Sequence, residues 1–110
     1  FGALVLNETV GGLNPAAVQA AAALGARVIW LPTLDAANHR RRSGKAGGIA
    51  MLRDGRLDPA LNEILTLVAR HDLALATGHI SPDEIHALVP AAFDAGVRRV
   101  VVTHPEHAIV

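Results

Sequence analysis

Cysteine is absent from the 110-residue chain, which excludes disulfide bonds, thiolate metal ligands and a cysteine nucleophile. Aromatic residues make up only 3% and the formal net charge is zero, so the stacking side chains and basic excess typical of nucleic-acid binding are missing. The longest apolar run extends only from Ala20 to Leu24, and no signal-peptide pattern is present. These absences predict a cytoplasmic protein with no membrane and no nucleic-acid partner.

The remaining composition is that of a globular protein, with 51% hydrophobic and 18% charged residues. The length allows one domain at most. Because the sequence begins at Phe1, inside an apolar run and without methionine, we expect a piece of a longer protein.

Four short apolar runs predict the strands of a parallel sheet. Each run is continuous rather than alternating, which is typical of strands buried on both faces. The runs are Ala3–Leu6, Arg27–Leu31, Leu73–Thr77 and Arg99–Thr103.

Three dipeptides between these runs predict helix starts, because each pairs a capping side chain with proline at the first helical position. They are Asn14-Pro15, Asp58-Pro59 and Ser81-Pro82. An insertion at residues 36–57 separates the second and third runs. Within it, Asp54-Gly55 between apolar residues predicts a β-hairpin, and the basic, glycine-rich stretch His39–Gly48 predicts an exposed, mobile loop.

The alternation of strands and helices predicts an α/β fold of parallel (β/α) repeats. Such repeats form either an open doubly wound sheet or a closed barrel. A complete barrel needs roughly 200 residues or more, so residues 1–110 are expected to form a single partial domain, half of a TIM-like barrel. Half of a barrel exposes one sheet face and two sheet edges, which predicts a homo-oligomer or a longer parent chain.

Polar residues follow the strands at the end where parallel βα folds place their sites. Thr77-Gly78-His79 follows the third strand, and Thr103-His104 follows the fourth. Neighbouring strands lie about 4.8 Å apart, so the two imidazoles could bind one metal ion. Each histidine could instead form only local hydrogen bonds. A catalytic zinc site needs about three protein ligands, and the third would come from Glu8, Asp35, His39 or a segment outside this sequence.

Asp35 and His39 lie four residues apart, so a helical turn would place them on one face as a catalytic base and its orienting partner. A helix cap and a solvent-exposed histidine are the alternative. The basic run Arg40–Lys45 could attract an anionic substrate or simply be solvated. The Gly11-Gly12 turn before a helix start could hold a phosphate on its N–H groups.

Four segments resemble a little-characterised family of metal-dependent hydrolases, similar to the amidohydrolase and polymerase-histidinol-phosphatase (PHP)-like groups. They are Leu6–Pro15, Trp30–His39, Ala76–His79 and Val102–Glu106. The resemblance implies a (β/α)₈ or distorted barrel with one or two divalent metal ions, in which this chain supplies about strands three to six. It also implies that His79 and His104 are metal ligands. The family's first-strand His-x-His motif and last-strand aspartate have no counterpart here, nor does its bridging lysine or glutamate on the fourth strand, unless Asp35 or His39 serves.

We therefore predict part of a metal-dependent hydrolase in which a divalent ion, zinc or else manganese, activates water to attack a carbonyl or phosphoryl centre of a small molecule. His79 and His104 are the predicted metal ligands, and Asp35 and His39 are the predicted catalytic residues. Two alternatives remain open. One is a non-catalytic half-barrel that self-associates through Val5, Trp30 or Leu75, and the other is an anion-binding α/β module that uses the Gly11-Gly12 turn.

Overall fold

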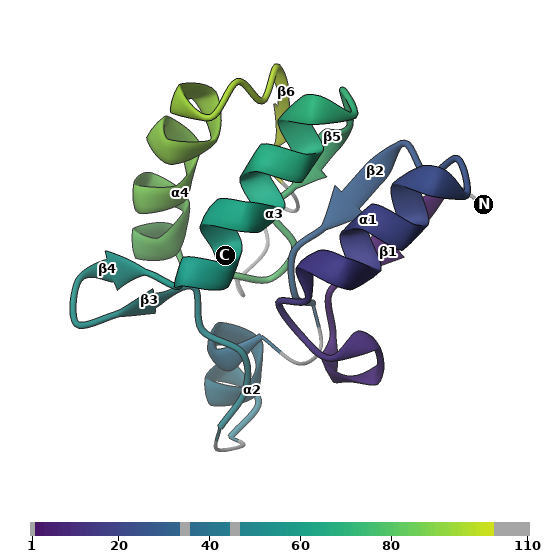
Figure 1. Cartoon of the computed structure of the whole chain (residues 1–110). Helices are drawn as coiled ribbons and strands as arrows, with labels where there is room; N and C mark the ends of the chain where they lie inside the picture. The colour runs from purple at the N-terminus through teal and green to yellow at the C-terminus, as the bar shows by residue number, and fades with distance from the viewer. Residues whose placement is uncertain (1, 34–35, 45–46, 103–110) are drawn as a thin grey trace.

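Four parallel strands form the central sheet, in the spatial order β1-β2-β5-β6 (Figure 1). The computed structural model describes residues 2–33, 36–44 and 47–102. The strands are β1 (Ala3–Val5), β2 (Val28–Trp30), β5 (Ala74–Ala76) and β6 (Arg99–Val101). All three pairings are parallel, which confirms the predicted parallel α/β class.

Three helices begin at the predicted capping residues: α1 (Pro15–Ala23), α3 (Pro59–Arg70) and α4 (Pro82–Asp94). The side chains of Asn14, Asp58 and Ser81 each accept a hydrogen bond from a main-chain N–H of the first helical turn. These bonds satisfy donors that a helix leaves without an internal partner, so local sequence fixes where each helix begins.

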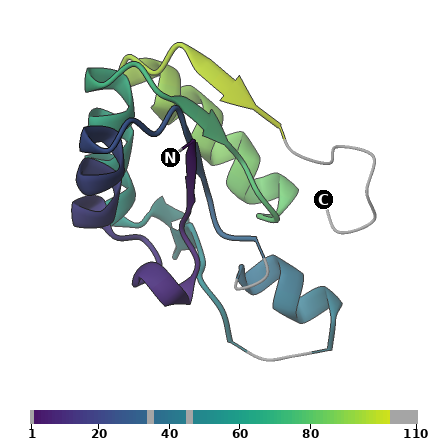
Figure 2. The same ribbon diagram turned by 90° about the vertical axis from the view of Figure 1, so that its right-hand side faces the viewer.

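The sheet is wound in a single direction, because the spatial order of its strands follows their order in the chain. Crossover connections between parallel strands are right-handed, so strands added on one side only bring every connecting helix to the same face. Figure 2 shows α1 and α3 on one side of the sheet, and residues of α1, α3 and α4 share one hydrophobic core with Ile29 and Leu75. A doubly wound sheet would instead carry helices on both faces.

Alternate strand residues face opposite sides of the sheet. Leu4, Ile29, Leu75 and Val100 pack into the helix-side core. The other side, here called the open face, carries Ala3, Val5, Val28, Trp30, Ala74, Ala76, Arg99 and Val101.

Within the described residues no helix covers the open face. The expectation of strands buried on both sides is confirmed for β5, whose Ala76 is only 1% exposed, and is wrong for the outer strands, where Ala3 and Val101 are exposed. Val5 and Trp30 are half-buried, and Val101 is 53% exposed. Leu75 was a candidate for this surface, but it is fully buried on the helix side. Leu75 is one residue from both Ala74 and Ala76, so its side chain points to the opposite side of the sheet from theirs.

The insertion between β2 and α3 contains α2 (Ala37–Arg42), β3 (Leu52–Arg53) and β4 (Arg56–Leu57). Asp54 and Gly55 both have left-handed backbone angles, as a tight hairpin turn between β3 and β4 requires. The predicted mobile loop is wrong for its first part, which is helical. The N–H of Ala37 donates to the carbonyl of Ile49, and alanine and arginine are good helix formers.

None of the helices in the described ranges combines the length and the apolar character that crossing a lipid bilayer requires.

Candidate functional site

The carboxyl ends of the four strands define one edge of the sheet, and η1 (Glu8–Val10) and α2 lie beyond it (Figure 1). A pair of reciprocal hydrogen bonds joins the first two strand ends. The Asn7 amide nitrogen donates to Thr33 Oγ1 over 2.9 Å, and the Thr33 main-chain N–H donates to the Asn7 side-chain oxygen over 3.0 Å. This arrangement, here called the Asn7–Thr33 clasp, holds the residues after β1 and β2 at a fixed separation.

The segment Thr77-Gly78-His79 after β5 is fixed to the strands on both sides. The N–H of Thr77 donates to the carbonyl of Val101 on β6, and the N–H of His79 donates to the carbonyl of Pro32 after β2. Thr77 is fully buried and His79 is half-buried. Main-chain hydrogen bonds on both sides therefore fix the backbone of His79 at the carboxyl edge.

Gly78 makes this close approach to the end of β2 possible. Its φ of +67° lies in the left-handed region, and a Cβ there would meet the Leu31 carbonyl oxygen and lie 2.6 Å from the Pro32 carbonyl oxygen. Only glycine fits a position with both a left-handed backbone and main-chain atoms this close. The glycine of the Thr-Gly-His segment thus has a structural role that determines where His79 stands.

The two predicted metal ligands follow neighbouring strands that are in register. Ala76 of β5 pairs with Val101 of β6. His79 comes three residues after Ala76, and His104 comes three residues after Val101. His104 itself lies outside the described residues. Among the residues that are described, no group of three or more histidine, aspartate or glutamate side chains could hold a metal ion.

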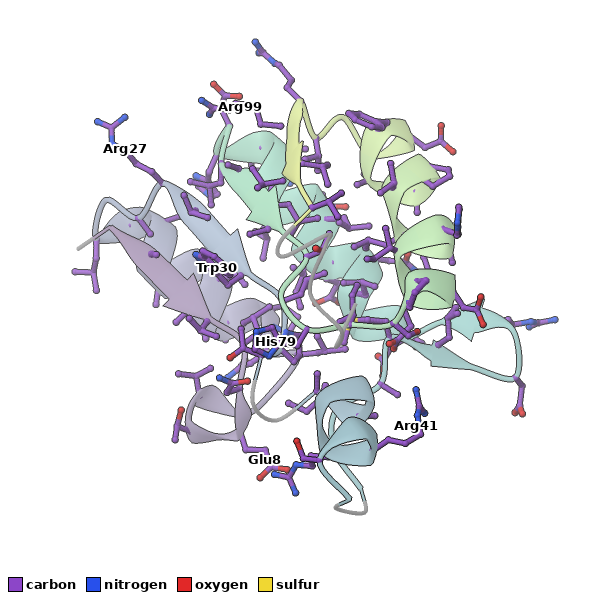
Figure 3. All side chains as sticks on the ribbon, turned by 180° about the vertical axis from the view of Figure 1, so that it is seen from behind. Glu8, Arg27, Trp30, Arg41, His79 and Arg99 are labelled. Atoms are coloured by element: carbon purple, nitrogen blue, oxygen red, sulfur yellow. The ribbon has the colours of Figure 1, made fainter. Side chains whose placement is uncertain are left out.

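The other predicted site residues are only partly placed. Asp35 lies outside the described residues, and His39 belongs to α2 but its side chain is not described. Arg40, the first cation of the predicted substrate-attracting run, forms an ion pair of 3.3 Å with Glu8 of η1. The basic run therefore starts at the carboxyl edge, where one of its charges is already matched by a carboxylate. Figure 3 labels Glu8 and Arg41, which lie at this edge.

The Gly11-Gly12 turn uses its N–H groups within the chain. Gly11 donates to the carbonyl of Glu8 and Gly12 to that of Asn7, while the N–H groups of Ala16 and Ala17 donate to the Asn14 side chain. The cleft beside this turn has a volume of about 470 Å³ and is lined by the carboxylates of Glu8 and Asp58. A phosphate would find no free donor among these four N–H groups, which disfavours the anion-binding alternative.

Sequence reasoning missed the part played by Glu84. Its spacing from Ser81 predicts a capping box, which the structure contains, but the carboxylate also accepts the N–H of Met51 over 2.5 Å. Glu84 is only 7% exposed, and it thereby fixes the insertion to the start of α4. No local signal could reveal this bond, because the two residues lie 33 positions apart.

The fold and this edge define a singly wound, parallel α/β protein whose half-buried histidine stands at the carboxyl end of a central strand. The family model described as "Family of unknown function (DUF6282)" matches residues 1–110, and the chain belongs to that family. No curated protein matches the chain, and no solved structure matches it.

Proposed function

We propose that this chain forms half of a (β/α) barrel and contributes His79 and His104 to a divalent metal site in a metal-dependent hydrolase. The single-direction winding supports the barrel part of the proposal, because a barrel adds each strand to the same side of the last. The active sites of such barrels lie at the carboxyl ends of the strands, where His79 stands.

The observation that carries the metal site is the register between β5 and β6. The Ala76–Val101 pairing makes these strands parallel neighbours, and His79 and His104 follow their paired residues at the same interval. Imidazole nitrogens at the ends of adjacent strands are suitable ligands for zinc or manganese. The described residues supply fewer than three ligands, so the proposed site needs His104 and at least one further donor, with Asp35 and His39 as candidates in this chain.

A bound divalent ion would supply an activated water for attack on a carbonyl or phosphoryl centre. The chain's own residues hold the surroundings of the proposed site in place. The Asn7–Thr33 clasp fixes the edge beside the site, and the two N–H···O bonds around Gly78 fix the backbone of His79. Glu8 and Arg40 form an ion pair at the same edge, and the other cations of the Arg40–Lys45 run can draw an anionic small molecule toward it.

The test is the metal content of the 110-residue chain, measured by elemental analysis after separate dialysis against zinc and against manganese. We expect His79→Ala and His104→Ala each to lower bound metal at least about tenfold, because each removes a ligand. His86→Ala is the matched control, since His86 is exposed on α4. Circular dichroism of each variant checks that the fold is kept. Equal metal binding by all three variants would overturn the proposal.

A further inference from the structure

The open face and the outer edges of β1 and β6 have no partner among the described residues of this sheet. All-parallel sheets occur almost only with both faces covered. Yet the row Val5, Trp30, Ala76 and Val101 crosses the open face in register, with the main helices on the opposite side. In this row the small Ala76 is buried between its neighbours, Val5 and Trp30 are half-buried, and Val101 is exposed. Figure 3 looks onto this face, and Trp30 lies in front of β2.

The outer strands also leave main-chain groups directed away from the sheet. Beside β1, the Gly2 carbonyl accepts from Arg27 and the Leu6 N–H donates to Trp30, so both groups face β2. Because main-chain groups alternate in direction along a strand, the N–H groups of Ala3 and Val5 face the outer edge. On β6, the carbonyl of Val101 accepts from Thr77, so the main chain of Val100 is directed outward. Such an edge is a template for pairing with another strand.

We propose that a second copy of this chain covers the open face, and that the two copies close into a ring of eight parallel strands. A two-fold axis parallel to the strands brings β6 of each copy beside β1 of the other, with all strands running the same way. One operation thus pairs all four edges and buries both open faces. The inference rests on the half-barrel arrangement of the proposed function and is independent of the metal ion.

The chemistry of the open face fits a second copy. Its strand residues include one charged side chain, Arg99, which is already paired with the carboxylate of Asp72 and donates to its carbonyl over 2.6 Å. The other seven residues are apolar, and they mix the large Trp30 with small alanines. Eight strands enclose an interior just wide enough for such side chains to fill. The chain has a formal net charge of zero, so two copies do not repel each other.

Trp30 provides a local probe, because it is the only tryptophan in the chain. We expect the 110-residue chain to sediment as a dimer of about 23 kDa, twice the 11.5 kDa of one copy. Dilution should convert it to the monomer, and Trp30 emission should then shift to longer wavelength and become more accessible to acrylamide.

Two charge insertions separate this interface from general surface hydrophobicity. Val101 on the open face is 53% exposed, so Val101→Arg can fold as a monomer, yet it should raise the dimer dissociation constant about a hundredfold or more by burying an unpaired charge. Leu24→Arg is the matched control, because Leu24 is 68% exposed at the end of α1 on the helix side, and it should leave the constant unchanged.

A chain that stays monomeric at all concentrations would overturn the inference and favour further strands of a longer protein as the cover. Equal effects of the two arginine variants, or oligomers larger than a dimer, would also overturn it. His79→Ala should still dimerise, so loss of the metal site and loss of this interface are separate results.

Discussion

Replacement of Gly78 by alanine tests how the candidate site is held at the sheet edge. The substitution adds one methyl group at φ +67°, next to the carbonyl oxygens of Leu31 and Pro32. The left-handed backbone costs about 1 kcal/mol for alanine relative to glycine. The collision with main-chain atoms adds about 1–3 kcal/mol, because β2 or the Thr77-Gly78-His79 segment must move.

We therefore expect Gly78→Ala to lower the free energy of unfolding by about 2–4 kcal/mol, a large part of the roughly 5–15 kcal/mol typical of a domain. In urea denaturation followed by circular dichroism this is a midpoint shift of about 1–2 M. The variant should also displace His79, so the metal binding that we propose for the carboxyl edge should fall with it.

Gly55→Ala is the control for the backbone cost alone. Gly55 has a φ of +77° in the hairpin turn, and a Cβ there meets nothing within 4 Å. Its substitution should cost only about 1 kcal/mol. If Gly78→Ala and Gly55→Ala shift the urea midpoint equally, the close approach between Gly78 and the end of β2 is not what holds this segment.

Three further tests probe other contacts by urea denaturation. Glu84→Gln should cost about 1–3 kcal/mol, because a buried N–H loses its charged acceptor, while Glu63→Gln on the exposed side of α3 should stay within about 0.5 kcal/mol. Asn7→Ala and Thr33→Val should show a coupling energy of about 1 kcal/mol in a double-mutant cycle, and additive losses would argue against the clasp. Arg40→Ala should cost less than about 1 kcal/mol and less still in high salt, since its ion pair is partly exposed; a loss above 2 kcal/mol that ignores salt would contradict this.

Much of the secondary structure could be predicted because its signals are local. The capping side chain and proline at Asn14, Asp58 and Ser81 each act within one helical turn, and the structure begins a helix at each. The turn at Asp54-Gly55 is equally local, because the two residues themselves adopt the left-handed angles. The α2 helix was missed because a short, basic and glycine-flanked segment has no such signal, and a bond from Ala37 to Ile49 helps to hold it in place.

The candidate site could be predicted only in part. The sequence places histidines after two strands, and parallel order makes those strand ends neighbours, so the position of His79 at the edge could be expected. The contacts that hold it there could not, because the Asn7–Thr33 clasp spans 26 positions and the bond from His79 reaches back to Pro32. The predictions for Asp35 and His104 lie outside the described residues and stay predictions.

The sequence by itself determined the starts of the three main helices and the hairpin turn, since each depends on residues close together in the chain. It also determined the parallel α/β class, because apolar strand runs alternate with helix starts along the chain. Only the tertiary structure decided that the main helices pack on one side and that, in the described residues, no helix covers the row through Trp30. The continuous apolar runs predicted burial on both faces, and they did not indicate that the main helices would cover only one. Which face is covered depends on the direction of winding, and that is a property of how distant segments pack.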